Sequence, residues 1–447
     1  MKILKYIIAL AFFIPISIYG QEIALKHSGT QYDAFENPEQ SGFEKDLSKR
    51  NAISIFPAFH MLFNFKGVSS NGFKELLLSQ NIDSTTFSDI GLAKMNRTNI
   101  KTNIYLFTYR ILKSEKNDKE LGFSVQLRED GRAKITNETF ALIQSFNNFS
   151  PTSYQGIFND KGINQSYWQF NVNYRQKYDD QWAFGGKVGL IDGISYNKVA
   201  ITTSDFAINT LTNSYSANFV GNYYSSFGTD TFKIKQLYPD LKNLGLSVSG
   251  GVAFTSKKGF YFTVNIKDLG FIHWNNKTSV KYSYNNTITI ANASSSNADD
   301  RFYTAFSNIA NNNPINKNLY STLNTKIDVA VSKRFKNYMP VFVISKSTFR
   351  SDGQIGLLNN FKWRILNLGI NPIYDFNSGL NLGTQLMLKS PNMEFYIGSE
   401  AFKPTQNLIN GIQKDDINII DKTPRASFYM GLTMKFEKKD TRFWRCK

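Results

Sequence analysis

The stretch Ser427–Phe436 reads SFYMGLTMKF, and it decides how the whole chain is interpreted. Apolar side chains occupy every second position, namely Phe428, Met430, Leu432, Met434 and Phe436, and more polar or smaller residues lie between them. Successive side chains of a β-strand point to opposite faces, so the pattern predicts a strand with one apolar and one more polar face. A soluble sheet can have the same pattern, so the rest of the chain must show whether the strand belongs to a soluble sheet or to a membrane barrel.

Similar alternating segments recur along the chain, as in Tyr167–Tyr174, Leu244–Thr255 and Tyr261–Trp274. The 447 residues include 38 Phe and 23 Tyr, yet the mean hydropathy is only -0.33. Apolar residues diluted by alternation are typical of transmembrane β-barrels, whereas membrane helices collect them into runs. The sequence therefore predicts an all-β fold, a transmembrane antiparallel barrel of about 14 strands (range about 12 to 16). A short N-terminal lead-in and one or two short helices complete the prediction.

The chain divides into four predicted parts. Residues 1–20 are typical of an export signal, with Lys2 and Lys5 before the apolar run Tyr6–Ile14 and a cleavage point before Gln21. Residues 21–50 form a polar periplasmic lead-in or a plug segment, residues 51–437 the outer-membrane barrel, and residues 438–447 a C-terminal tail. No later run is apolar and long enough for a membrane helix, and lipid otherwise accepts only closed barrels. The predicted location is therefore the cell outer membrane.

The connections between strands are predicted to differ in length. Lys257–Gly259, Ser351–Gly353 and Asn377–Gly379 are tight turns, whereas residues 292–318 form a long polar loop. Outer-membrane barrels have short turns at one end and long loops at the other. Gly72–Gln80 and Thr136–Phe146 have helical apolar spacing, and they either cap or plug the barrel or pack on its rim.

Two residue types suggest details of the barrel. Gly185, Gly186, Gly189 and Gly193 interrupt the predicted strand Trp182–Tyr196, and such glycines are typical of bends and bulges. A phosphate-binding loop would need a helix and a G-K-[ST] sequence, which are missing here. We expect girdles at the lipid–water boundary from Trp168, Trp182, Trp274 and Trp363. The barrel should close by antiparallel pairing of the last strand with Ala52–Phe65.

The sequence favours a non-enzymatic protein. Only His27, His60 and His273 offer imidazoles, and neither G-x-S-x-G nor H-E-x-x-H occurs. We expect His27 to be solvated in the lead-in, His60 to line the lumen or rim, and His273 to share an interfacial position with Trp274. With Cys446 as the one cysteine, no thiolate metal site can form, and we predict no metal and no cofactor.

The net charge of +17 comes from 52 Lys and Arg against 35 Asp and Glu. The basic residues are scattered rather than gathered in runs, so nucleic-acid binding is not predicted. Attraction to anionic lipid headgroups or a basic pore lining fits the scatter better.

Two segments resemble a known family. Tyr32–Pro38 followed by Asp46–Arg50 looks like the start of an uncharacterised Bacteroidota outer-membrane β-barrel family, a domain of unknown function, and Lys267–Trp274 looks like a central segment of it. The matching positions are Asn37, Pro38, Asp268, Gly270 and Trp274. Asn37-Pro38 is also distantly similar to the Asn-Pro-Ala start of fatty-acid transporter barrels and of the type IX secretion shuttle barrel, with Glu39 in place of alanine. These resemblances imply a 14-stranded barrel with its N-terminal segment near the lumen.

The leading prediction is a pore or scaffold of unknown substrate. Its candidate lumen or strand-kink positions are Pro57, His60, Arg175, Lys187 and Lys435. Basic residues in a narrow lumen would favour anions or small polar solutes, and a kink at Pro57 would offer a sideways exit for a fatty-acid-type transporter. The alternatives are a partner-binding subunit of an envelope or secretion complex and, lowest, a barrel hydrolase. Expected partners are outer-membrane lipid, the barrel-insertion machinery and envelope proteins.

Overall fold

The computed structural model describes residues 23–43, 49, 51–113, 119–227, 234–293, 295, 297–310, 313–349 and 352–436. The predicted export signal, most of Asp46–Arg50, the tail at residues 438–447 and Cys446 lie outside these ranges. Among the described residues, no helix is long and apolar enough to cross a membrane.

Strands make up most of the described chain. They are β1 (Asn51–Lys66), β2 (Met95–Lys113), β3 (Lys119–Thr136), β4 (Ser153–Gln155), β5 (Lys161–Lys177), β6 (Trp182–Asn209), β7 (Ser214–Ser225), β8 (Leu244–Thr255), β9 (Phe260–Trp274), β10 (Val280–Ala291), β11 (Ile315–Asn316), β12 (Leu319–Thr322), β13 (Lys326–Lys333), β14 (Tyr338–Ser347), β15 (Gly353–Trp363), β16 (Leu366–Asp375), β17 (Gly379–Lys389), β18 (Met393–Ser399) and β19 (Arg425–Phe436). The helices are α2 (Gln31–Glu36), α3 (Ser70–Ser79), α4 (Asn137–Gln144), α5 (Ala298–Ala310) and α6 (Phe402–Lys414), with 3-10 turns η1 (Pro38–Phe43), η2 (Phe146–Asn148) and η3 (Ile234–Leu237).

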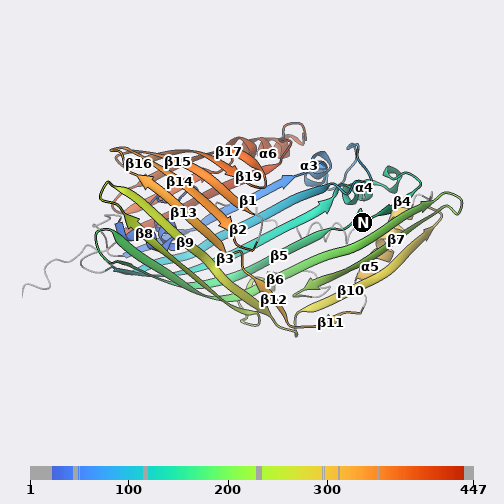
Figure 1. The fold of residues 1–447 in the computed structure, drawn as a ribbon, viewed down its shortest axis with the longest axis horizontal. Helices are drawn as coiled ribbons and strands as arrows, with labels where there is room; N and C mark the ends of the chain where they lie inside the picture. The colour runs from blue at the N-terminus through green and yellow to red at the C-terminus, as the bar shows by residue number, and fades with distance from the viewer. Residues whose placement is uncertain are drawn as a thin grey trace, which may run out of the picture.

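Fourteen strands close into an antiparallel barrel, which confirms the predicted fold (Figure 1). The ring runs β1-β2-β3-β5-β6-β8-β9-β13-β14-β15-β16-β17-β18-β19 and returns to β1. The seam pairs Asn51 with Phe436 at one end and Asn64 with Arg425 at the other. The predicted pairing of the first and last strands is therefore confirmed.

The alternation of Ser427–Phe436 sorts its side chains as predicted. Tyr429, Thr433 and Lys435 are buried toward the lumen, while Met434 and Phe436 are 45% and 40% exposed on the outside. β8 repeats the pattern around the ring, with Leu246 and Val248 outside and Ser247 and Ser249 buried inside. The barrel thus has a continuous apolar exterior. Its interior is polar on β8 and β19, whereas β14, β15 and β16 place the buried apolar residues Val341, Val343, Leu358 and Ile373 inside.

The two ends of the barrel differ, as the sequence predicts. At the end we call the short-turn end, a few residues join β5 to β6, β8 to β9, β13 to β14, β15 to β16 and β17 to β18. In the first of the predicted tight turns, Gly259 takes the positive φ of 78° that glycine tolerates best. The opposite end, the long-loop end, carries α3, α4, α5 and α6. Two of the three predicted tight turns also lie at this end, because they join β14 to β15 and β16 to β17.

The predicted helices at Gly72–Gln80 and Thr136–Phe146 correspond to α3 and α4. Two other helices are departures from the prediction. α5 forms within the stretch expected to be a loop, because Phe302 and its neighbours pack on the barrel extension described below. α6 carries Pro404 in its first turn, where a proline costs no helical hydrogen bond.

A sheet extends beyond the ring at the long-loop end (Figure 1). β6 is 28 residues long, about three times the 9–11 residues that cross a membrane. Its first half pairs with β8 in the ring, and its second half pairs with β7, which in turn pairs with β10. We call the β6 second half, β7, β10 and α5 the outer extension.

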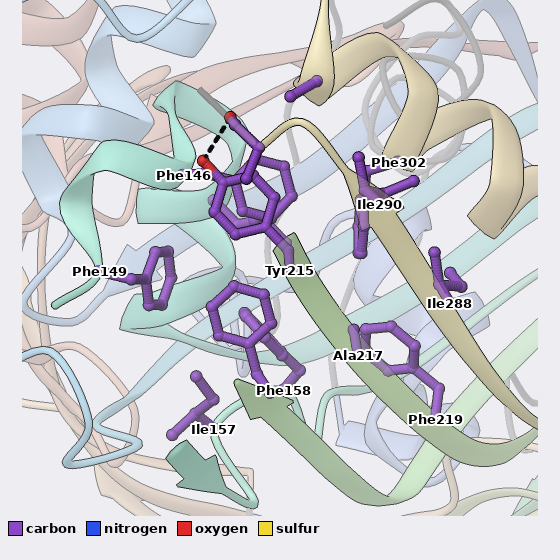
Figure 2. Packing of buried hydrophobic residues seen from close by; sticks show 14 of the residues in the cluster. Phe146, Phe149, Ile157, Phe158, Tyr215, Ala217, Phe219, Ile288, Ile290 and Phe302 are labelled. Atoms are coloured by element: carbon purple, nitrogen blue, oxygen red, sulfur yellow. Dashed lines mark hydrogen bonds between the residues drawn. The ribbon is translucent and has the colours of Figure 1, made fainter. Parts of the chain in front are cut away.

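The outer extension has an aromatic core of its own (Figure 2). The Phe146 ring stacks on Tyr215 with centroids 4.4 Å apart and meets Phe302 edge-on at 5.0 Å. The Tyr215 hydroxyl donates to the Ala293 carbonyl at 2.9 Å. Phe206 is 1% exposed at the centre of this cluster. Such a core is typical of a soluble domain.

One girdle prediction is wrong. Trp274 is fully buried inside the barrel, where its indole Nε1 donates to Ser321 Oγ at 2.8 Å. Its ring occupies the space left by the missing side chain of Gly193, because a Cβ there would lie 2.6 Å from the ring. Trp182 and Trp363 are 40% and 50% exposed on the outer face.

Candidate functional site

The N-terminal segment fills the barrel. Residues 23–40, which we call the plug, are all buried except for Gly29, which is half-buried. Thr30 caps α2 by accepting a hydrogen bond from the Asp33 backbone N–H at 3.2 Å, and Asn37 ends the helix. The prediction that His27 is solvated is wrong, because His27 is 5% exposed and its ring contacts Ser332 and Thr263.

The plug contacts opposite walls of the ring. At one end Glu400, which follows β18, accepts the Ile23 backbone N–H at 3.0 Å. Gln31 contacts Thr108 on β2 with its side chain, and its backbone N–H donates to Glu394 on β18. Across the lumen, Asn265 on β9 lies 3.4 Å from Asn37. Contacts on so many strands place the segment within the lumen rather than on its rim.

Aromatic rings surround α2. Tyr32 stacks on His60 with centroids 3.6 Å apart and meets Tyr105 edge-on at 5.2 Å. His60 Nε2 lies 3.0 Å from the hydroxyl of Tyr396. The contacts of His60 are therefore with aromatic side chains of the plug and wall, which gives it a packing role.

A bulge in β9 places two consecutive charges inside the barrel. The register against β8 shifts between Gly250–Ile266 and Val248–Leu269, and Asp268 has a φ of 52°. Lys267 and Asp268 are therefore both buried, at 5% and 3% exposure, although adjacent strand residues normally face opposite ways. Gly270 is required nearby, because a Cβ there would lie 2.1 Å from the Leu246 carbonyl oxygen.

Asp268 and Asp328 organise the wall charges. The Arg128 guanidinium donates to the Asp268 carboxylate, and Lys187 lies 3.4 Å from the same group. Lys267 pairs with Asp328 at 2.6 Å. All these side chains lie in a low-dielectric interior, where an ion without a partner is costly.

The plug carries charges that join this network. Lys26 pairs with Glu39 of the plug at 3.2 Å and approaches Asp328 at 4.0 Å. Glu36 accepts hydrogen bonds from the Tyr105 hydroxyl and the Asn103 amide, both at 2.7 Å. Burial opposes its ionisation, but Lys187 and Arg128 outweigh burial and lower the pKa of Glu36 to about 2. Glu36 is therefore a buried carboxylate held in a site of cations and donors.

The pKa of Asp33 is shifted in the opposite direction to that of Glu36. Burial raises the pKa of Asp33 to about 7, although Lys26 and the Gly29 backbone N–H favour its charged form. Its carboxylate accepts hydrogen bonds from Gly29 at 3.0 Å and from the Asn37 side chain at 2.7 Å. The plug therefore has one acid that titrates near neutrality and one that stays ionised.

Gly185 lets the plug approach the wall. A Cβ at this position would lie 2.3 Å from the Pro38 carbonyl carbon and 2.5 Å from the Glu39 nitrogen. The residue is paired regularly in β6, so its role is close approach rather than the predicted bend. The register of this strand shifts at Ile194, directly after the predicted Gly193, and again at Thr202 against β7.

A cavity of about 260 Å³ lies beside the plug at the short-turn end. Its lining includes Arg110, Arg175, Glu120, Glu394 and Lys435. Arg175 pairs with Glu120 and donates to the Ala34 carbonyl at 3.0 Å, and Lys435 pairs with Glu394 at 2.6 Å. Arg175 and Lys435 are therefore neutralised by acids, unlike the cations of a bare basic pore lining, whereas Arg110 donates to the Lys49 carbonyl.

The predicted lumen positions His60, Arg175, Lys187 and Lys435 all have buried side chains in the barrel interior. Pro57 lies where β1 loses register with both β19 and β2. Their roles in transport stay predictions. Sequence reasoning missed a further set of charged wall and plug residues: Lys26, Glu36, Glu39, Arg128, Lys267 and Asp328. The adjacent charges Lys267 and Asp268, which break the alternation of an otherwise apolar strand, were the available signal.

No catalytic or metal constellation is found in the part of the chain that the structure describes. The two nitrogens of His27 contact hydroxyl groups at 2.9 and 3.0 Å, without a carboxylate to orient the ring. Groups of three or more His, Cys, Asp or Glu that could hold a metal are absent from the described residues.

A model of a family of unknown function, DUF5723, matches residues 46–400. The chain belongs to this family. The match includes the wall charges and Gly185, whereas the plug lies before it. None of the curated proteins matches the sequence.

Several solved barrels are similar in fold to this family member. The toluene transporter TodX of P. putida is 6% identical, with a TM-score of 0.42 over 91% of this chain and 94% of that chain. A FadL homologue of Pseudomonas aeruginosa is 9% identical, with a TM-score of 0.44 over 90% and 94%. The translocator domain of autotransporter NalP from Neisseria meningitidis is 8% identical, with a TM-score of 0.32 over 94% and 100%.

Proposed function

We propose that the protein is a non-enzymatic outer-membrane pore that the plug keeps closed, and that displacement of the plug admits small anionic solutes. The observation that carries the proposal is the burial of residues 23–40 inside the ring. A segment that fills the lumen and is bound to the wall by polar contacts and by apolar residues such as Ile23 and Leu25, without being part of the sheet, can leave without breaking the barrel wall.

Membrane insertion is supported by the outer face of the ring. Large apolar side chains stay exposed on strand after strand, as in Val188, Val264, Val329, Leu357 and Ile370. Exposed apolar surface of this extent is unfavourable in water and is expected where lipid covers it. The ring has no free edge, which is the condition for strands to enter lipid.

The preference for anions is supported by the surroundings of Glu36. Its carboxylate is held by Tyr105 and Asn103 and by the positive charges of Lys187 and Arg128. Once the plug leaves, the same donors and cations face the lumen without Glu36. Among the described residues Asp268 is then the one carboxylate paired with the two cations Arg128 and Lys187, so this group of charges is net positive. A solute with a carboxylate group matches that arrangement, because charge-assisted hydrogen bonds are the strong ones.

Planar-bilayer recordings test this proposal. We expect the full chain to be closed and a chain lacking residues 23–40 to conduct, with a reversal potential shifted toward anions. Glu36→Gln should give intermediate openings, whereas Glu129→Gln, whose carboxylate accepts from Asn164 on the wall, should stay closed. A folded deletion variant without conductance would rule out the pore, and cation selectivity would rule out the anionic solute.

A second candidate, a partner-binding subunit, is favoured by the edge of the outer extension. β11 pairs only with Val280 and Lys281 of β10, so among the described strands the rest of β10 pairs on one side only. Residues 282–291 contain no charge and no proline, the devices that normally protect an edge. An added partner strand is the occupant that this edge fits. Thr287→Pro should abolish capture of such a partner from solubilised membranes and leave closure of the pore unchanged.

A further inference from the structure

Three neighbouring turns at the short-turn end carry only positive charge. They join β8 to β9, β13 to β14 and β15 to β16, and these strands follow one another around the ring. The turns and the strand ends beside them contain no acid and seven basic residues: Lys257, Lys258, Lys333, Arg334, Lys336, Lys362 and Arg364. We call this set the basic rim.

The basic rim is accessible. Lys257, Lys258, Arg334, Lys336 and Arg364 are exposed, and the described residues include no acid paired with any of these five. The neighbouring turns differ. Asp180 beside β6 pairs with Lys177, and Glu394 of β18 is buried against Lys435. The positive charge is therefore concentrated on one arc of the rim.

A row of aromatic rings lies directly beside the basic rim, on the outer face. Trp182 contacts Phe254 with centroids 4.7 Å apart, Phe254 lies 6.4 Å from Phe262, and Phe262 lies 6.3 Å from Phe260. Lys333 Nζ lies 4.5 Å from the Phe260 ring and 5.6 Å from the Phe335 ring.

The row continues on the next strands. Tyr338 stacks on Phe361 at 5.0 Å, and Phe361 lies 6.2 Å from Trp363. Aromatic residues of membrane proteins concentrate at the level of the lipid headgroups. The basic rim, one step further from the apolar belt, therefore stands at the height of the phosphates.

We propose that the basic rim binds the phosphate groups of anionic phospholipids in the leaflet that the short-turn end enters. This inference rests on the proposed membrane location but not on the pore. Arg and Lys near a membrane surface attract anionic lipid, and the arginine fork suits phosphate oxygens. The apolar belt, continuous with the aromatic row, holds the acyl chains of the same lipids. Continuity with the belt favours a lipid over a soluble partner.

The test compares lipid retention by the full chain and by two matched variants. The rim variant is Lys257→Gln, Lys258→Gln, Arg334→Gln and Lys336→Gln. The control is Lys277→Gln, Lys317→Gln, Lys403→Gln and Lys414→Gln, which removes as much charge from exposed positions near the long-loop end. Each protein is reconstituted in equimolar phosphatidylglycerol and phosphatidylcholine and extracted, and the retained lipids are counted by native mass spectrometry.

We expect the unmodified chain and the control to retain more phosphatidylglycerol than phosphatidylcholine. In the rim variant the ratio of retained phosphatidylglycerol to phosphatidylcholine should fall about tenfold. Equal retention of both lipids by the unmodified chain, or an unchanged preference in the rim variant, would overturn the proposal. Displacement of phosphatidylglycerol by inorganic phosphate would also overturn it, in favour of a free-anion site. Flotation of all three proteins with phosphatidylcholine vesicles tests membrane insertion separately, and bilayer recordings test the pore.

Discussion

The lumen and the outer extension are both buried, yet they are packed with different kinds of side chain. Around the plug, ion pairs such as Arg128–Asp268 and Lys267–Asp328 meet carboxamides and hydroxyls, and an apolar cluster that includes Ile23 of the plug lies beside them. In the outer extension, Phe146, Phe206 and Tyr215 pack in an aromatic core with few polar atoms.

The difference concerns what each region can do. Apolar packing has no competitor in water, so the outer extension is held as a permanent unit. The polar contacts of the plug are exchanged with water at small net cost, whereas release would expose its apolar residues Ile23, Leu25 and Phe35 to water. The plug therefore combines exchangeable polar contacts with an apolar anchor, and the extension depends mainly on its apolar core.

Among the substitutions that test the difference between the lumen and the outer extension, removal of the Asp268 carboxylate should lower the stability most. Asp268→Asn removes the carboxylate that pairs with Arg128 and Lys187, and loss of one partner of a buried ion pair typically costs about 3–5 kcal/mol. We expect a fall of this size in the free energy of unfolding, measured in urea by the change in gel mobility of the folded barrel. Asp240→Asn, in an exposed pair with Lys242, serves as the control and should change the stability by less than about 0.5 kcal/mol. Equal free energies of unfolding for Asp268→Asn and Asp240→Asn would show that the charge network around Asp268 is dispensable for stability.

Phe206→Ala should destabilise the aromatic core of the outer extension and leave the lumen unchanged. Truncation of a buried phenylalanine costs about 3 kcal/mol or more, and the cost here should fall on the outer extension. Limited proteolysis should cleave the extension while the ring stays intact and closed to ions. Leu211→Ala, at a position 96% exposed, should leave the protease pattern unchanged. A conducting Phe206→Ala barrel would mean that the two regions are coupled.

Gly185→Ala should loosen the plug without touching any charge. The added methyl group would overlap Pro38, and overpacking of this kind costs about 1–3 kcal/mol. We expect brief openings in bilayer recordings. Gly250→Ala on the paired strand is the matched control, since a Cβ there meets no atom closer than 3.8 Å. Openings of the same frequency in both variants would contradict the assigned contact.

The pH dependence of closure should report on Asp33. Its pKa is raised to about 7 in the docked plug, so docking is strongest below the ordinary value of 3.8 and weakens as pH rises toward 7. Glu36, with a lowered pKa of about 2, acts only in the acid range below its ordinary value of 4.5. His27 acts in the opposite direction, because burial lowers its pKa well below 6.5 and its contribution to docking therefore grows as pH rises through the ordinary histidine range. The contribution of Asp33 is isolated by comparison with Asp33→Asn: between about pH 5.5 and pH 7, docking of the unmodified plug should weaken by about 1.5 kcal/mol relative to the variant, seen as a relative rise in opening frequency. The same change of opening frequency with pH in both proteins would refute the assignment.

The sequence alone determined the ring. The period of two in segments such as Ser427–Phe436 dictates which side chains face lipid and which face the lumen, and this holds whatever the neighbouring strand is. The prediction of about 14 strands agrees with the ring, although the segments of β7 and β10 are also strand candidates in the sequence and only the structure places them outside the ring. The seam followed from the position of the first and last strands. Local rules also located α3 and α4, whose apolar residues recur at helical spacing.

Only the tertiary structure decided what fills the ring. Residues 31–36 are too few to show a helical pattern. The burial of the plug depends on walls that are distant in the sequence, as in the contact of Ile23 with Glu400, 377 positions away. The bulge that turns both Lys267 and Asp268 inward interrupts the inside–outside alternation of β9, and the sequence prediction depends on that alternation. Alternation is a local property of the backbone and can be read from one strand. The partners of a buried charge come from many strands, and only ring closure brings them together.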